Sequence, residues 1–356
     1  MFHAGQNPQP YPCPDAFIAK FDPNGNLAWA SYLGGLGIEL AYGVATDPSN
    51  NVYVVGLTQS SDFPRVKPFQ AAFGGYADAF ITKVTADGNT ILYSSTLRGQ
   101  GYDIAYAVAV DSAGGAHLAG QFGAEVPNLP GAGFATPCNS LGLSGFLAKV
   151  NPGGDQLAFG GCLGGASSST VTALALDRQG NIYAAGSAGR NFPVTPGAFN
   201  GATAPGYTNF VQKIAGDGSA LVYSAVFPGG SFGVSGIATE VNQTVYLVGE
   251  VEGDRFPIAG PAMQPCPGPG SLARNSLVHL KADGSAPLYS SFDSGWRLAL
   301  APEGSLYVGG TALRKLTALD APGDSFLSRS CVLNGASMAS HLDYGQPAFL
   351  RAKSSR

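Results

Sequence analysis

Four carboxylates recur at one position of a repeated segment and are the first residues whose type and spacing could support chemistry. They are Asp47, Asp111, Asp177 and Glu240. Each stands at the end of what we expect to be the innermost strand of its repeat, so closure of the repeats around an axis would place a ring of oxygens near one mouth of a channel. Such a ring could hold a cation.

A simpler interpretation is that each carboxylate accepts hydrogen bonds from the amides of its own turn. Pro302 interrupts the series in the fifth copy, and none of the turns has the D-x-[DN]-x-[DN]-G spacing of a calcium loop. We therefore favour the simpler interpretation and predict no metal and no cofactor.

Two tyrosines, Tyr42 and Tyr106, begin two of the same inner strands and complete the set of candidate binding residues at the channel mouth. In an alternative hypothesis Asp47 and Asp111, together with either tyrosine, serve a polysaccharide lyase or glycoside hydrolase. The inner strands otherwise carry mostly Ala, Val and Thr. We therefore predict no catalytic residue.

Histidine and serine give weaker signals. His117 stands where the other copies have Tyr, and His279 where they have Lys, but no paired His or Cys spacing accompanies either residue. Residues 229–233 spell G-x-S-x-G, yet they lie in a loop between strands rather than in the strand-turn-helix context of a nucleophile elbow. Neither pattern indicates a catalytic site.

The elements that must position these residues are β-hairpins. Residues 41–58, AYGVATDPSNNVYVVGLT, are two short apolar runs joined by a polar turn, and copies begin at residues 105, 171, 235 and 296. A second hairpin type occupies residues 15–35 and recurs between these copies. Its turn glycines repeat with a period of about 65 residues and are Gly25, Gly88, Gly154, Gly218 and Gly284.

One period therefore contains four strands, and such a unit can bury both faces only by stacking against its neighbours. Radial stacking predicts an all-β protein, a β-propeller of four-stranded antiparallel blades. We expect five blades, with six, or an open piece of a larger ring, as alternatives. Residues 1–14 are then part of an inter-strand loop, residues 15–320 form the propeller repeats, and residues 321–356 form a truncated tail.

Ring closure has two candidate strands. The chain opens with the second hairpin type, and its last complete hairpin, residues 296–310, is of the first type, so the two could share one blade. Residues 312–319, however, compete with residues 15–21 for the third-strand position. The pattern does not choose between them.

Aromatic side chains fall in register once per copy, and we expect them to fill space between blades. They are Trp29, Tyr93, Phe159, Tyr223 and Tyr289.

The five cysteines are Cys13, Cys138, Cys162, Cys266 and Cys331. Three of them, Cys13, Cys138 and Cys266, lie in loops rich in proline and suit an oxidising compartment, but the odd count leaves at least one cysteine unpaired or paired to another chain, and the pairing stays open. We interpret Cys162 as a small buried apolar residue within a strand.

Composition and charge argue against a nucleic-acid partner, a membrane span and a helical fold. The 356 residues carry a net charge of -4, and only 12% are charged, without a Lys/Arg cluster, so we predict no nucleic-acid partner. No apolar run has the length of a membrane span, and the first residues lack the pattern of a signal peptide. Gly (51) and Pro (25) are the residues of many tight turns between short strands, which argues against helix.

Four motifs recur in a fixed order: D-A-F-[IV]-x-K at Asp15 and Asp78, Y-G-[IV]-A-x-D at Tyr42, N-[VI]-Y-[VA]-x-G at Asn51 and Asn181, and D-F-P at Asp62. Together they resemble the SBBP (seven-bladed β-propeller) repeat family of bacterial, largely extracellular proteins. The resemblance implies a propeller at the cell surface or outside the cell, and it brings no catalytic residues. Residues 330–337, SCVLNGAS, resemble the start of a C-terminal domain on secreted proteins of soil bacteria.

Taken together, these features favour a non-catalytic extracellular repeat protein that acts as a binding or structural scaffold. A rigid scaffold with long, divergent loops suits binding, and the partner we expect is a protein or a polysaccharide.

Overall fold

The computed structural model describes residues 2–3, 14–70, 72–123, 129–138, 142–164, 168–189, 191–201, 207–230, 233–252, 256–260, 273–293, 295–301, 303–310 and 313–316. Strands are the only regular elements in these ranges, and they form six sheets. None of the described segments is a helix long and apolar enough to cross a membrane.

The first three sheets are built as follows. The first contains β1 (Phe2–His3), β2 (Ala16–Phe21) and β3 (Leu27–Gly34); the second β4 (Glu39–Thr46), β5 (Val52–Thr58), β6 (Asp78–Val84) and β7 (Ile91–Leu97); the third β8 (Ile104–Val110), β9 (Ala116–Phe122), β10 (Ser144–Val150) and β11 (Leu157–Leu163).

The other three sheets continue the series. The fourth contains β12 (Ser169–Leu176), β13 (Ile182–Ala188), β14 (Thr208–Ile214) and β15 (Leu221–Pro228); the fifth β16 (Val234–Thr239), β17 (Val245–Glu252), β18 (Ala273–Leu280) and β19 (Pro287–Asp293); the sixth β20 (Gly295–Leu300), β21 (Leu306–Gly310) and β22 (Leu313–Leu316).

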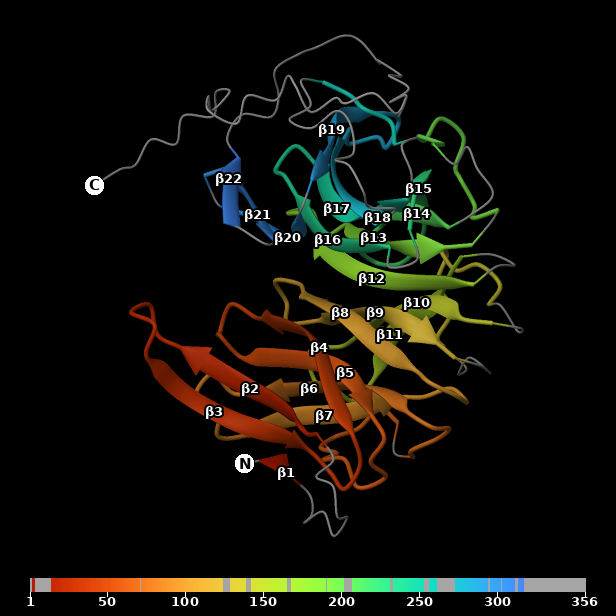
Figure 1. Cartoon of the computed structure of the whole chain (residues 1–356). Helices are drawn as coiled ribbons and strands as arrows, with labels where there is room; N and C mark the ends of the chain where they lie inside the picture. The colour runs from red at the N-terminus through yellow and green to blue at the C-terminus, as the bar shows by residue number, and fades with distance from the viewer. Residues whose placement is uncertain are drawn as a thin grey trace.

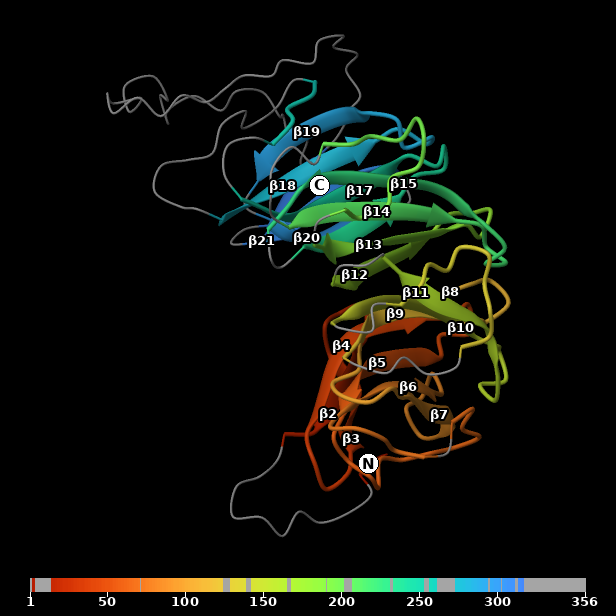
Figure 2. The ribbon, with the colours of Figure 1, turned by 90° about the vertical axis from the view of Figure 1, so that its right-hand side faces the viewer.

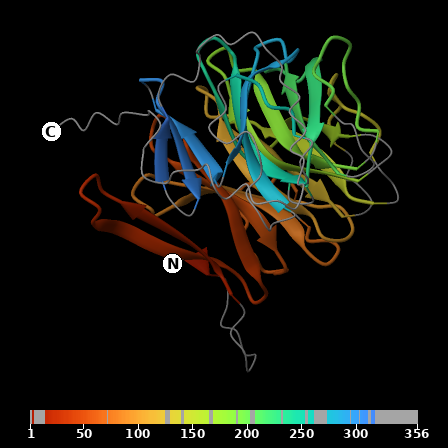
Figure 3. The same cartoon turned by 45° about the horizontal axis from the view of Figure 1, so that its top comes forward.

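The sheets follow one another around an arc. In each complete sheet the strands pair antiparallel in chain order. The first strands β4, β8, β12, β16 and β20 contact one another in sequence and form the inner side of the arc. Figures 1 and 3 show the arc running from the first hairpin, in red, to the sixth sheet, in blue, with both ends on the same side of the molecule. Figure 2 shows the first five sheets stacked in chain order from the N-terminal end upward, with β20 and β21 of the sixth sheet lower in the view than β18 and β19.

The inner hairpins turn where the sequence predicts. In the second sheet the amide of Asn50 donates to the carbonyl of Asp47 at 2.8 Å, and Asn50 has a left-handed backbone with φ 61°. The equivalent residues of the next four sheets have the same left-handed conformation, which Gly adopts without strain. They are Gly114, Gly180, Gln243 and Gly304.

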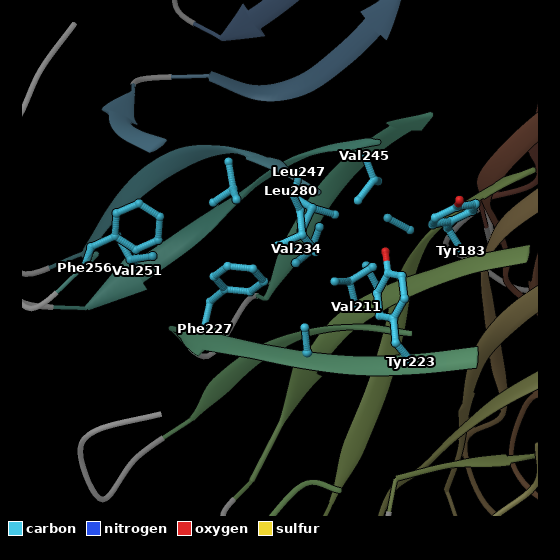
Figure 4. Packing of buried hydrophobic residues seen from close by; sticks show 14 of the residues in the cluster. Tyr183, Val211, Tyr223, Phe227, Val234, Val245, Leu247, Val251, Phe256 and Leu280 are labelled. Atoms are coloured by element: carbon cyan, nitrogen blue, oxygen red, sulfur yellow. The ribbon is translucent and has the colours of Figure 1, made fainter. Parts of the chain in front are cut away.

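Apolar cores lie between successive sheets rather than within them. Between the fourth and fifth sheets, Tyr223 and Phe227 pack against Val234, Leu247 and Phe256. Figure 4 shows these side chains directed toward one another from the two sheets. The predicted all-β propeller of four-stranded antiparallel sheets is therefore confirmed. Five blades stays a prediction.

Both ends of the chain add detail that the repeat pattern did not contain. β22 pairs antiparallel with β21, so residues 313–316, and not residues 15–21, hold the third-strand position in the sixth sheet. Residues 1–14 were predicted as loop, but β1 within them pairs parallel with β3. The tail 321–356 lies outside the described residues.

One disulfide corrects an interpretation. Cys162 is buried in β11 as expected, but it is bonded to Cys138, with the two Cα atoms 5.3 Å apart. The amide of Thr136 also donates to the carbonyl of Cys162 at 3.0 Å, so the loop carrying Cys138 is tied to the edge of the third sheet. Cys13, Cys266 and Cys331 lie outside the described residues.

The aromatic series lies between sheets. Tyr93, Phe159, Tyr223 and Tyr289 are buried. The turn glycine of the next sheet packs on the ring of the preceding one: a Cβ added at Gly154 would lie 2.1 Å from Tyr93, and Gly218 faces Phe159 in the same way. The indole nitrogen of Trp29 donates to the carbonyl of Ala86 at 3.1 Å.

Candidate functional site at the inner strands

Asp47 is used by its own turn. Its Oδ1 accepts the amides of Ser49 at 3.0 Å and Asn51 at 2.9 Å, and its Oδ2 accepts the Asn51 side-chain amide at 2.9 Å. The Lys83 ammonium lies 3.1 Å from Oδ2. Burial opposes ionisation, but these hydrogen bonds and the lysine outweigh it and hold the pKa of Asp47 at about 2.

The third sheet repeats the arrangement with one substitution. Asp111 accepts the amides of Ala113 at 3.0 Å and Gly115 at 2.8 Å, and its Oδ2 lies 2.8 Å from the Lys149 ammonium. His117 replaces the tyrosine, with its Nε2 3.5 Å from Asp111. Burial, reinforced by Lys149, lowers the pKa of His117 to about 4, so the imidazole is neutral at pH 7.

The fourth and fifth sheets also hold their acids locally. Asp177 accepts the amide of Asn181 at 2.8 Å, and the Lys213 ammonium lies 3.9 Å away. Glu240 accepts the hydroxyl of Thr244 at 2.7 Å. His279 lies 3.6 Å from Glu240 and replaces the lysine of the other sheets.

In the fifth copy of the turn the series of carboxylates is interrupted, but at a different residue from the one predicted. The amide of Ala301 donates to the carbonyl of Ser305 at 2.8 Å, as the amide of Asp47 does to that of Asn51 at 3.1 Å. Ala301, not Pro302, therefore occupies the carboxylate position, and Pro302 lies outside the described residues. The sixth sheet instead has Glu303, 3.7 Å from the Lys315 ammonium.

The geometry of the series is that of turn stabilisation. In all four acidic copies the carboxylate accepts hydrogen bonds from its own turn and pairs with a cation or histidine of the third strand. No group of three or more His, Cys, Asp or Glu side chains in the described part of the chain could hold a metal ion. A channel-mouth binding role for these four acids stays a prediction.

A β-bulge occurs at one position of every inner strand. The register of β4 with β5 skips between Ala41 and Gly43, which leaves Tyr42 outside the regular ladder. The equivalent residues of the other inner strands are Tyr106, Thr172, Ser235 and Trp296. Bulges redirect a side chain and are common beside binding sites.

Glycine on the neighbouring strand makes room for each of the first three bulges. A Cβ added at Gly56 would lie 1.9 Å from the carbonyl oxygen of Leu40, and one at Gly120 would lie 1.8 Å from that of Ile104. Gly186 is in the same position, 1.9 Å from the carbonyl oxygen of Thr170. The last residue of the N-[VI]-Y-[VA]-x-G motif is therefore required by the close approach of the bulged backbone.

Two of the bulged side chains are half exposed. Tyr42 is 45% exposed and Trp296 is 48% exposed. The rings of Tyr42 and Tyr106 meet edge to face with their centroids 5.1 Å apart. Burial raises the pKa of both phenols, so both are protonated donors at neutral pH.

A cavity of about 690 Å³ opens at the turn end of the fourth, fifth and sixth sheets. Its polar lining includes Arg178, Thr239, Glu240 and Asn242, and its apolar lining includes Leu298. Of the six predicted binding residues, only Glu240 lines this cavity. Tyr42 and Tyr106 lie together at their bulges, while Asp47, Asp111 and Asp177 are each held in separate turns.

The sequence did not single out two exposed residues, Trp296 at a bulge and Arg178 in the lining of the cavity. Trp296 occupies the bulge position of Tyr42, and its signal was its place five residues before the turn position. Arg178 follows Asp177 directly in the turn and had no distinguishing pattern. Ser231, in the G-x-S-x-G sequence, lies outside the described residues.

One family model matches a part of the chain. Residues 28–64 match the family model described as SBBP, Beta-propeller repeat. Comparison with curated proteins found no match.

Two solved structures are similar over much of the chain. A quinohemoprotein alcohol dehydrogenase, ADHIIG, from Pseudomonas putida HK5 has a TM-score of 0.41 at 9% identity, over 83% of this chain and 53% of that one. The chain thus spans about half of the dehydrogenase. A protein assigned as a 6-phosphogluconolactonase from Bacteroides fragilis NCTC 9343 has a TM-score of 0.36 at 10% identity, over 83% of both chains. With its stacked four-stranded sheets and its matched repeat, the chain is a β-propeller repeat protein.

Proposed function

We propose that the chain is a non-catalytic binding scaffold, outside the cell or at its surface, which takes a polysaccharide or protein partner at its inner-strand bulges and in the cavity at the turn end of the fourth to sixth sheets. The observation that carries the proposal is the exposure of Tyr42 and Trp296 at bulges, where a side chain is free of the ladder. Exposed aromatic rings supply apolar area together with a polar edge, which suits contact with sugar rings and with protein side chains alike.

The protonation states of Asp47 and Asp111, the two acids of the hydrolase hypothesis, support binding rather than catalysis. A hydrolase of the retaining or inverting kind needs one carboxylic acid that is protonated near neutral pH beside one that is ionised. Asp47 has a pKa of about 2 and is engaged by Lys83, and the pKa of Asp111 is also lowered, because Lys149 and the turn amide of Gly115 outweigh the effect of burial. Neither is suited to donate a proton.

The proposed setting draws on the disulfide. A bond between Cys138 and Cys162 persists in oxidising compartments and is rare in reducing ones. It supports a location outside the cell or at its surface.

The test compares binding with turnover. We expect the chain to be retained by one class of polysaccharide in an array, or by one protein in a cross-linked pull-down, without release of reducing ends or unsaturated sugars. Tyr42→Ala and Trp296→Ala should each weaken retention about tenfold or more, as hot-spot aromatics do. Tyr207→Ala is the matched control, since Tyr207 is also half exposed but follows a variable loop. Turnover that Asp47→Asn abolishes would contradict the proposal and favour the hydrolase or lyase hypothesis.

A further inference from the structure

The two ends of the row of sheets expose apolar side chains that are buried at the same positions elsewhere. We call the side of a sheet that packs on the preceding sheet its leading face, and the opposite side its trailing face. On the leading face, Phe80, Phe146 and Phe210 lie four residues before the end of their strands and are at most 1% exposed. Phe17, at the same position of β2, is 69% exposed.

Phe17 belongs to a larger apolar surface on the first hairpin. It pairs across the strands with Tyr32, and Phe21 pairs with Leu27. The exposed fractions of Tyr32, Phe21 and Leu27 are 53%, 60% and 58%. We call these four residues the hairpin patch. Contiguous exposed groups of large apolar side chains mark interaction sites.

The other end of the chain has the counterpart on a trailing face. Leu277 of β18, three residues before the end of its strand, is fully buried against Leu306, Val308 and Leu316 of the sixth sheet. Leu313, at the same position of β22, is 74% exposed. Tyr307 lies beside it on the same face, with the Lys315 ammonium 5.4 Å from its ring centroid. We call Leu313 and Tyr307 the tail patch.

The two patches lie on opposite faces of their sheets, one leading and one trailing, and are therefore complementary. At every internal interface a trailing face receives a leading face, as where Ile81 and Tyr53 pack with Phe146. Among the described residues, no sheet packs on the leading face that carries the hairpin patch, and none packs on the trailing face that carries the tail patch. The two patches are therefore suited to meet head to tail, in a heterologous contact, rather than each with its own kind.

We propose that the hairpin patch of one chain docks on the tail patch of a second copy of this chain, so that copies join end to end through one more interface of the internal type. In Figure 1 the first hairpin and the sixth sheet lie apart on one side of the molecule, and strands of the two sheets do not pack together. To meet within one chain, the arc would have to tighten at several apolar cores that are already close-packed. A second copy meets either patch without such movement. This proposal is independent of the proposed binding function.

The experiment measures mass in solution with single-patch variants of the whole chain. Size-exclusion chromatography with light scattering should give the unmodified chain a mass at least twice that of one chain, rising with concentration. Phe17→Asp blocks the hairpin patch and Leu313→Asp blocks the tail patch, and each variant alone should have the mass of one chain. An equal mixture should form a species of two chains that grows no further, because its remaining ends are both blocked. Val222→Asp, on another half-exposed apolar residue, should behave as the unmodified chain does.

Three results would overturn the proposal. The first is a single-chain mass for the unmodified protein at all concentrations. The second is self-association of Leu313→Asp alone, which would mean hairpin-to-hairpin contact. The third is a mixture of the two variants that stays at the mass of one chain. Circular dichroism and melting of both variants should match the unmodified chain, since both side chains are exposed.

Discussion

The phenolic oxygen of Tyr53 lies 3.1 Å from the carbonyl oxygen of Gly114, so the second strand of one sheet is hydrogen-bonded to the inner turn of the next. Tyr183 makes the same link to the carbonyl of Gln243, also at 3.1 Å. The tyrosine of the repeated motif therefore joins neighbouring sheets at the level of the carboxylate turns. Its recurrence has a structural cause that does not depend on any ligand.

Tyr53→Phe should lower the free energy of unfolding by about 1 kcal/mol, because the carbonyl of Gly114 and the Oδ2 of Asp47, 3.2 Å away, share this hydroxyl as a buried donor and both lose it. Tyr93→Phe is the matched control, since its buried hydroxyl has no hydrogen-bond partner among the described residues. That variant should be unchanged or slightly more stable. Urea titrations of the two variants check this, and equal losses would contradict the role given to Tyr53.

Asp47→Asn should destabilise the fold in a pH-dependent way. Its folded-state pKa of about 2 is below the ordinary value of an aspartate, so its ionised form stabilises the fold above about pH 4, and this contribution is lost as the pH falls toward 2. We expect a loss of about 1 to 2 kcal/mol at pH 7 for a charged hydrogen-bonding group. The difference from the unmodified chain should shrink between pH 4 and pH 3 in denaturant titrations. A difference that is constant over this range would argue against the Lys83 and turn contacts.

Asp78→Asn should stabilise the fold at high pH, whereas Asp47→Asn destabilises it. Asp78 is fully buried, and its Oδ1 has no hydrogen-bond partner among the described residues. Burial, with a smaller contribution from the neighbouring Asp103, raises its pKa to about 7. Because the folded-state pKa is above the unfolded one, stability falls as the pH rises from about 4 to 7.

Replacement of Asp78 by asparagine removes that loss and keeps an acceptor for the amide of Gly74, which donates at 3.1 Å. The variant should gain about 1 kcal/mol or more over the unmodified chain at pH 8, and little at pH 4, by an order-of-magnitude conversion of the pKa shift that allows for screening. Thermal unfolding at the two pH values measures the gain. A variant that is less stable at pH 8 would disprove the unfavourable burial of this carboxylate.

Removal of the disulfide should lower stability by about 2 to 4 kcal/mol, through the greater freedom of the unfolded chain. The test is the double variant Cys138→Ser, Cys162→Ser, compared with the unmodified chain in reductant. Both should unfold at the same denaturant concentration, and reductant should not change the double variant further. Insensitivity of the unmodified chain to reductant would show that the bond contributes little.

Gly120→Ala should destabilise the chain by about 3 kcal/mol or prevent folding, because its Cβ would lie 1.8 Å from the carbonyl oxygen of Ile104 at the bulge. Gly131→Ala is the control, since a Cβ there meets no atom within 4 Å. Comparison of the soluble yield and the melting temperature of the two variants decides the matter. Tolerance of both would mean that the bulge relaxes.

Local patterns in the sequence predicted the hairpins well. Asp47 and Asn51 define a turn through their own hydrogen bonds, and Gly88 and Gly154 mark turns that need a left-handed residue, so these elements follow from a few neighbouring residues. The period then predicted the stacking of sheets, because a four-stranded unit with two apolar faces has few ways to bury them.

Features that depend on distant contacts were not predictable in this way. An alternating pattern does not reveal one extra residue, so the bulge at Tyr42 was missed, although Gly56 was its signal. The pairing of Cys138 with Cys162 joins a variable loop to a strand and has no local pattern. The third strand of the sixth sheet could not be chosen because residues 15–21 and 312–319 have the same apolar character, and only the structure distinguishes them.

The bulges separate the surface chemistry of this molecule from its architecture. The five bulge positions hold two phenols, two aliphatic hydroxyls and an indole. Tyr106 packs on the apolar cluster of Leu57, Ala77 and Ile104, and the hydroxyl of Thr172 donates to the carbonyl of Val234, whereas Tyr42 and Trp296 are half exposed. For binder engineering, the half-exposed Tyr42 and Trp296 are therefore the first positions of this row to vary.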